Sequence, residues 1–231
     1  MKKAVLTLIC FLNFLIIPNE IIASPLGDAM RIARSAAVRV FTDCVYLIKL
    51  KSGAELYLTP IPRFGGNGFF VKSKNYTNAV LTASHVVTCP NFFDENIFPD
   101  AFDKDQITTV TNAARLRVEY NGLRYKANLV KLLISADNVD KDLALLDVQL
   151  PSDVQHTKVS IDQGDDLDLG DEVWVLGYLQ LSSEEKDPRL SSWLIRHSVI
   201  SDIVGGTIKL REFMFPGESG SMIAVIKEGL P

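Results

Sequence analysis

Three side chains spread over the sequence have the types needed for nucleophilic chemistry. His85 lies in the stretch TASHVV (82–87), Asp142 begins the stretch DLALLDV, and Ser219 lies in the stretch PGESG (216–220). A serine hydroxyl attacks well only when a base takes its proton and a third group holds that base in the correct tautomer. The types predict Ser219 as nucleophile, His85 as base and Asp142 as the group that orients the imidazole.

The surroundings of His85 are apolar. Ala79-Val80-Leu81 precedes it and Val86-Val87 follows, so the pattern predicts an imidazole at the end of a buried strand. Burying a charged ring without a partner is costly, so we expect His85 to be neutral or paired. The other two histidines, His156 and His197, lack this setting and are interpreted as surface residues or satisfied strand residues.

The stretch PGESG can also supply an oxyanion hole. The N–H groups of Gly217 and Ser219 would point to one side, toward the charge that develops on an attacked carbonyl. Gly217 permits close approach of the substrate, and Gly220 leaves space for a tight turn behind the serine. A plain surface turn is the alternative, because proline, glycine and serine are common in turns.

Two other carboxylates compete with Asp142 as the partner of His85. Asp147 lies five positions further along the expected strand, so the two side chains point to opposite faces. Asp140 shares a face with Asp142 but lies further from the apolar run. Asp142 is therefore the favoured residue.

Short β-strands at regular spacing must position these groups. A helix is expected only over 25–36, and Asn121-Gly122 is a strong hairpin turn. We expect strands or hairpins over 38–50, 51–59, 65–73, 76–87, 114–132, 142–150, 171–179, 193–204, 207–215 and 222–226. The pattern predicts an all-β pair of barrels or a sandwich.

The halves of the chain are separated by polar, turn-rich residues. We expect an N-terminal segment over 24–36, an N-terminal barrel with His85 and Asp142 over 37–150, a linker over 151–168, and a C-terminal barrel with Ser219 over 169–231.

The first 23 residues have the features of a secretory signal peptide. A basic Lys2-Lys3 pair precedes an apolar run over 4–17, and cleavage is expected after Ala23. An uncleaved membrane anchor is the alternative; after cleavage we expect no membrane span. In an oxidising compartment Cys44 and Cys89 could form a disulfide, and two free buried thiols are an equal alternative.

Composition excludes several other functions. The 231 residues carry a net charge of −4, which gives no footprint for nucleic acid. The sequence contains neither a CxxC pair nor an HExxH motif, so we expect no metal and no cofactor.

From about residue 37 onward the chain resembles trypsin-like serine peptidases, most of all the bacterial HtrA/Deg type. Five blocks carry the resemblance in order: GNGFFV (66–71), VLTASHVV (80–87), KDLALLDV (141–148), LGDEVWVLGY (169–178) and PGESGSMI (216–223). The order of the three site residues, His85, Asp142 and then Ser219, is that of chymotrypsin-like proteases.

The resemblance implies two six-stranded β-barrels with a catalytic site between them. It implies a serine endopeptidase that cleaves protein or peptide substrates through an acyl-enzyme, with Gly217 in the oxyanion hole. By family position Phe213 and Met214 lie near the base of the specificity pocket, and both are apolar.

The sequence also departs from the family pattern. Glu218 replaces the usual Asn or Asp, and Ser221-Met222 replaces Gly-Pro. Two strands that the family has after the serine, one lining the specificity pocket, have no counterpart before Pro231, and no PDZ domain follows. We therefore expect either a fragment of a longer gene product or an incomplete second barrel. The rival interpretations are an inactive pseudoenzyme or protein-binding module and a structural β-barrel with coincidental motifs.

Overall fold

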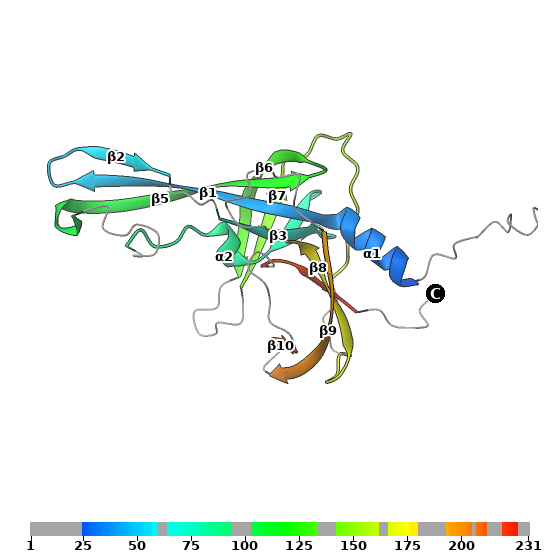
Figure 1. Ribbon diagram of the computed structural model, residues 1–231. Helices are drawn as coiled ribbons and strands as arrows, with labels where there is room; N and C mark the ends of the chain where they lie inside the picture. The colour runs from blue at the N-terminus through cyan, green and yellow to red at the C-terminus, as the bar shows by residue number, and fades with distance from the viewer. Residues whose placement is uncertain are drawn as a thin grey trace, which may run out of the picture.

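The computed structural model describes residues 25–59, 64–93, 103–133, 142–161, 166–179, 193–204, 207–211 and 219–225. Within them the chain forms two sheets with two α-helices and one short 3₁₀ helix, η1, at Lys104–Gln106 (Figure 1). The helices are α1 (Pro25–Ala36) and α2 (Ser84–Val87). The strands are β1 (Ala37–Leu50), β2 (Glu55–Leu58), β3 (Phe64–Phe70), β4 (Ala79–Thr82), β5 (Ile107–Tyr120), β6 (Leu123–Leu133), β7 (Leu143–Val148), β8 (Glu172–Tyr178), β9 (Trp193–Val204), β10 (Thr207–Leu210) and β11 (Met222–Ala224).

The larger sheet closes on itself. Its order is β2-β1-β3-β4-β7-β6-β5, and an additional pairing between β1 and β5 makes six of these strands a barrel. Alternate residues of each strand point inward, so the barrel core collects the apolar ones. Its fully buried side chains include Val38, Val40, Phe70, Val80, Val118 and Leu146.

Strand β1 is longer than the barrel and continues into an arm. Its residues 37–42 pair with β3, residues 46–49 pair with β2, and β5 follows its opposite edge from 39 to 50. Figure 1 shows β1, β2 and β5 projecting together from the barrel on the left of the view. A second apolar cluster of Cys44, Tyr46, Ile48 and Phe92 covers one face of this arm.

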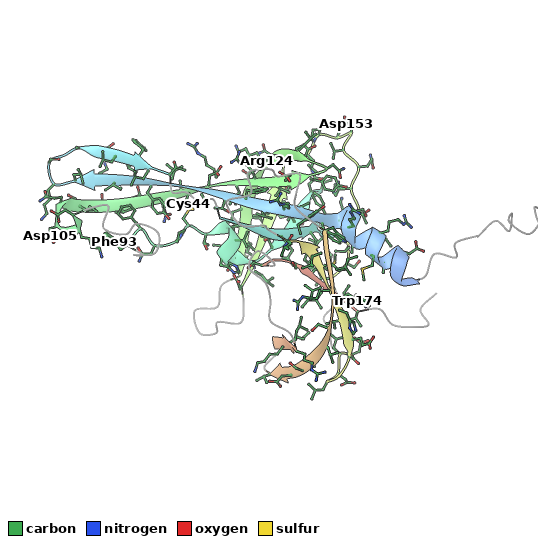
Figure 2. The ribbon with its side chains drawn as sticks, in the orientation of Figure 1. Cys44, Phe93, Asp105, Arg124, Asp153 and Trp174 are labelled. Atoms are coloured by element: carbon green, nitrogen blue, oxygen red, sulfur yellow. A yellow bond between two sulfur atoms is a disulfide. The ribbon has the colours of Figure 1, made fainter. Side chains whose placement is uncertain are left out.

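A disulfide fixes the segment after α2 to the arm. Cys44 on β1 is bonded to Cys89, with 5.6 Å between the Cα atoms. The Tyr46 hydroxyl donates a hydrogen bond to the Pro90 carbonyl at 2.8 Å. The chain that follows α2 is therefore held against β1, and Cys44 can be located on the arm in Figure 2.

The smaller sheet has the order β10-β9-β8-β11. Strand β8 lies at its centre and contributes the buried Val173, Val175 and Leu176. Trp174 points to the face opposite Val173 and Val175, and its ring lies 4.9 Å from that of His197 on β9 (Figure 2). In Figure 1 this sheet lies below the barrel, with β8 nearest to it.

The polar segment predicted as a linker is docked on the barrel. Val159 exchanges two backbone hydrogen bonds with the end of β3, through Lys72 N–H at 2.9 Å and the Phe70 carbonyl at 3.0 Å. The Thr157 hydroxyl accepts a hydrogen bond from Ser35 at the end of α1, at 2.7 Å. Over 151–161 the connection is therefore a packed part of the first half, while the expected boundaries of the two halves stay predictions.

Several predicted elements differ in extent from those observed. The hairpin turn lies at Asn121-Gly122, with φ of 50° and 76°, as a two-residue turn requires. The expected strand over 76–87 was wrong in its second half, because β4 ends at Thr82 and Ser84–Val87 is helical. Strand β5 begins at Ile107, seven residues earlier than the expected hairpin. Among the described residues, no helix is both long and apolar enough to cross a membrane.

Candidate active site

His85 lies on the short helix α2, immediately after strand β4. Val86 and Val87 are each 2% exposed and anchor the helix in the barrel core, whereas 58% of the His85 side chain is exposed. Successive residues of a helix point about 100° apart, so a buried valine can follow an exposed histidine. The expectation that His85 ends a buried strand was therefore wrong, because the residue lies on a helix.

The partner of His85 is Asp142, the residue before β7. Strand β7 pairs with β4, and Ala144 lies opposite Thr82, so the start of β7 meets the start of α2. One carboxylate oxygen of Asp142 contacts Nδ1 of the imidazole. The other accepts the backbone N–H of His85 at 2.9 Å.

Ser84 also binds this carboxylate, and sequence reasoning missed it. Its hydroxyl donates to the same Asp142 oxygen that binds the His85 backbone, and its N–H donates to the Asp142 carbonyl at 3.2 Å. Ser84 is 6% exposed, so its hydroxyl needs a partner within the protein. The only signal in the sequence was a hydroxyl residue directly before the histidine.

These contacts set the charge of Asp142. Partial burial by itself raises the pKa of the carboxyl. The hydrogen bonds from the Ser84 hydroxyl and from the His85 backbone and ring together lower this pKa by more than burial raises it. The net pKa lies below the usual value for aspartate, so the carboxylate is ionised at neutral pH. An anion against Nδ1 keeps the proton on that nitrogen and leaves the lone pair of Nε2 for another proton.

Ser219 reaches the same region from the far end of the described chain. Its carbonyl oxygen accepts the backbone N–H of Asn67 on β3 at 2.6 Å. A Cβ added to Gly66 would lie 2.7 Å from that carbonyl oxygen and 2.6 Å from Cγ2 of Val86, the residue after His85. The fold therefore brings Ser219 and the helix that carries His85 against one point of β3.

The structure does not join all three predicted site residues by hydrogen bonds. His85 and Asp142 are in contact, but within the described part of the chain no hydrogen bond links the Ser219 hydroxyl to the imidazole. Catalytic hydrogen bonds are often long before substrate binds. Gly217, Phe213 and Met214 lie outside the described residues.

The competing residues are placed elsewhere. Asp147 lies inside β7 opposite Ala79 and Asn128, and Asp140 is outside the described residues. His197 on β9 faces Glu172 of β8 at 3.4 Å, which fits the interpretation of a satisfied strand residue. His156 is on the docked 151–161 segment, with its ring 4.2 Å from that of Phe70, and burial lowers its pKa. The interpretation of His156 as a surface or strand residue was wrong.

The described residues contain no group of three or more histidine, cysteine or acidic side chains that could hold a metal ion. The contacts that the structure shows are those of an imidazole oriented by a carboxylate and of a Ser219 segment bonded to strand β3.

Comparisons with known proteins concern the family and the fold. A family model described as a trypsin-like peptidase domain matches residues 66–225. The crystal structure of AL20, a thermostable serine protease from an extremophilic microorganism, aligns with 85% of this chain and 81% of its own, with 14% identity and a TM-score of 0.51. This likeness shows the fold, which is the all-β chymotrypsin-like one.

A second structure, the inactivated protease paralogue S-I1 of the scabies mite, aligns with 84% of this chain and 79% of its own, with 15% identity and a TM-score of 0.46. No curated protein matches the sequence at a significant level.

Proposed function

Because the chain belongs to the trypsin-like peptidase domain family, we propose that it is a serine endopeptidase that hydrolyses peptide bonds through an acyl-enzyme. The observation that carries this proposal is the contact between Asp142 and Nδ1 of His85, formed by two residues that lie 57 positions apart in the sequence. A carboxylate on Nδ1 is what an imidazole needs to serve as a general base through Nε2.

In the proposed reaction, the Ser219 hydroxyl oxygen attacks the carbonyl carbon of the scissile bond while His85 Nε2 takes the hydroxyl proton. The N–H groups of Gly217 and Ser219 stabilise the oxyanion of the tetrahedral intermediate. The intermediate collapses when the C–N bond breaks and His85 returns the proton to the leaving amine. Water then attacks the acyl-enzyme by the same path, with His85 again as base, and releases the second product.

The substrates we propose are proteins or peptides, as expected of a peptidase domain. Phe213 and Met214 are apolar and belong by family position to the specificity pocket, which favours uncharged side chains at the cleavage site. Within the family we propose a relationship to the HtrA/Deg type, on the five sequence blocks that resemble it.

An active-site probe tests the proposal. A fluorophosphonate should label the wild-type chain once, and the labelled peptide should contain Ser219. Ser219→Ala and His85→Ala should both lose the label, whereas Ser52→Ala, which changes an exposed serine in the β1–β2 turn, should keep it. Labelling that persists in Ser219→Ala would refute the assignment of the nucleophile.

The alternative function is an inactive pseudoenzyme or protein-binding module of the same fold. The specific observation that favours it is the missing hydrogen bond between the Ser219 hydroxyl and His85 among the described residues. This alternative predicts a folded protein that no fluorophosphonate labels and that binds peptides without cleaving them.

We also propose that the protein acts outside the cytoplasm, secreted or in a periplasm, after removal of residues 1–23. The disulfide between Cys44 and Cys89 supports an oxidising compartment. Intact mass of the secreted protein should place the new N-terminus at Ser24. A mass that retains residues 1–23 would favour the membrane-anchored alternative.

A further inference from the structure

Asn67 is a buried polar side chain for which the proposed chemistry has no use. It lies on β3, between two glycines, and is 2% exposed. A buried side-chain amide is costly unless its donors and acceptor have partners. The partners of Asn67 lie in three different parts of the chain.

The amide pairs with the backbone of Tyr178 at the end of β8. Its Oδ1 accepts the Tyr178 N–H at 2.7 Å, and its Nδ2 donates to the Tyr178 carbonyl at 3.0 Å. The Asn67 side chain thus makes one donor and one acceptor contact with the backbone of β8, as a neighbouring strand would. It links the barrel to the smaller sheet.

The same residue holds the segment that carries Ser219. Its backbone N–H donates to the Ser219 carbonyl at 2.6 Å, and its Nδ2 also donates to the Ser221 hydroxyl at 3.2 Å. Asn67 therefore binds the residue proposed as nucleophile and the second residue after it.

Asn67 is also connected to the strand that leads to His85. Its carbonyl accepts the Thr82 hydroxyl at 2.6 Å, and Thr82 is the last residue of β4. Only Ala83 and Ser84 separate Thr82 from His85. One residue of β3 is thus bonded to the element that presents the base and to the element that presents the nucleophile.

Glycines surround Asn67 where these elements approach one another. A Cβ on Gly220 would overlap the Asn67 carbonyl and approach the Thr82 hydroxyl to 2.8 Å. A Cβ on Gly177 would overlap the Ser221 hydroxyl and lie 3.1 Å from the Asn67 amide. Any residue larger than glycine at these two positions would collide with its neighbours. Asn67 is therefore packed closely against both β8 and the Ser219 segment.

We propose that Asn67 is a positioning residue that sets the place of Ser219 relative to His85. The inference rests on the proposed function, because it assigns Asn67 an effect on the reaction of Ser219. Asn67 touches neither substrate nor the reacting atoms. It acts by fixing the backbone from Ser219 to Ser221 on β3 and β8, and an error of about 1 Å in such a placement can cost on the order of 100-fold in rate.

Two substitutions of Asn67 separate its hydrogen bonds from its volume. Asn67→Asp keeps the shape but replaces the donor Nδ2 by an oxygen that faces the Tyr178 carbonyl. Asn67→Ala removes the three side-chain hydrogen bonds described above. Ser221→Ala removes a single acceptor and leaves the β8 contacts, so it remains informative if the Asn67 variants fold poorly.

The matched control is Asn78→Ala. Asn78 is a half-buried amide of the first barrel, whereas Asn67 is buried, and its Nδ2 likewise donates to a backbone carbonyl, that of Val148, at 3.1 Å. This contact lies within the barrel and involves neither Ser219 nor β8. A loss of stability without a loss of positioning is therefore expected.

The experiment compares kcat and KM for a peptide substrate, and the rate of fluorophosphonate labelling, at a temperature well below the Tm of every variant. We expect Asn67→Asp and Asn67→Ala to lower kcat and the labelling rate about 10- to 100-fold with a smaller change in KM. Ser221→Ala should show a smaller loss in the same direction. Asn78→Ala should lower Tm and leave kcat within about twofold.

Amide hydrogen exchange gives a second readout that needs no activity. Exchange over 219–225 should accelerate in Asn67→Ala and stay unchanged in Asn78→Ala. The inference is overturned if kcat falls equally in the two alanine variants, or if exchange over 219–225 is the same in both. A wild-type chain that neither turns over nor takes the label refutes the proposed function, and the exchange data alone then decide whether Asn67 docks the segment.

Discussion

The carboxylate of Asp142 holds His85 at two points, with one oxygen on the imidazole Nδ1 and the other on the backbone N–H of the same residue. The ring is therefore fixed relative to its own main chain as well as to Asp142. Turning the imidazole away would break a charge-assisted contact, and such contacts are stronger than neutral hydrogen bonds. An imidazole held in this way needs little further ordering to act as the proposed base.

Asp142→Asn should lower kcat by about 10³- to 10⁴-fold with little change in fold. The amide keeps the volume but removes the anion, and its NH₂ group favours the wrong tautomer of the imidazole. Steady-state hydrolysis of a peptide measures the loss, and circular dichroism checks the fold.

The control for this prediction is Asp147→Asn on the same strand. Asp147 is five residues away and contacts neither His85 nor Ser84 in the described structure. Its kcat should stay close to that of the wild type. Equal losses in the two variants would mean that charge on β7, rather than contact with His85, matters.

Ser84→Ala should raise the pKa of the Asp142 carboxyl. The Ser84 hydroxyl donates to the ionised form and is one of the contacts that lower this pKa, so its removal moves the value back toward that of ordinary aspartate. An NMR titration of the aspartate carboxyl carbons measures the change. A titration midpoint that stays in place would show that the backbone and ring of His85 suffice.

The same group makes stability depend on pH. A carboxyl whose folded pKa is depressed stabilises the fold above its unfolded pKa, and this contribution is lost as pH falls through the folded pKa. The Tm difference between wild type and Ser84→Ala should therefore be larger at pH 6 than at pH 2. At pH 6 we expect Ser84→Ala to lower the free energy of unfolding by about 1–2 kcal/mol. This is less than the loss at a fully buried charged pair, because Asp142 is partly exposed.

Gly220→Ala should lower both stability and labelling of Ser219. The backbone φ at Gly220 is +78°, and an added Cβ would overlap the Asn67 carbonyl. Gly122→Ala is the matched control, since its φ is +76° and a Cβ there meets nothing within 4 Å. Gly122→Ala should cost about 1–2 kcal/mol from backbone strain alone, and Gly220→Ala should cost more and slow the labelling reaction. Similar labelling rates in both variants would contradict the close approach.

Reduction of the disulfide between Cys44 and Cys89 should lower Tm. The two cysteines are 45 residues apart, and the entropy of a loop of that length corresponds to about 4 kcal/mol, with about 2–4 kcal/mol usual for such bridges. Thermal unfolding with and without dithiothreitol measures the effect. A Cys44→Ala, Cys89→Ala double variant should match the reduced wild type and should not respond to the reductant; a response there would point to some other target.

Local signals in the sequence explain most of the elements that were predicted. Asn121-Gly122 has the residue types that only a tight hairpin requires, and the apolar alternation of 38–50 predicts a half-buried strand. The choice of Asp142 as partner of His85 rested on the chemistry of a serine nucleophile, which needs a base and an orienting carboxylate, and on the place of Asp142 before an apolar run. The sequence did not predict that His85 lies on a helix, because a helix as short as α2 shows no periodicity.

The features that sequence reasoning missed are long-range. Asn67 is 111 residues from Tyr178 and 154 from Ser221, so no local pattern marks its partners. The sequence predicts a barrel but not which strands close it, because β1 and β5 pair residues as distant as Arg39 and Glu119, which are 80 positions apart. For the cysteines, composition left a bond and two free thiols equally open, and only the position of Cys89 beside β1 brings them together.

The six strands of the barrel all lie between Ala37 and Val148, whereas β8 and the Ser219 segment come later in the chain. The strands of the barrel and the contact between His85 and Asp142 therefore come from one continuous stretch of the chain, residues 37–148. The contacts of Asn67 with β8 and with the Ser219 segment need residues 172–225, which come later in the chain. The proposed base and the proposed nucleophile therefore come from two separate parts of the chain, and the hydrogen bonds of Asn67 connect them.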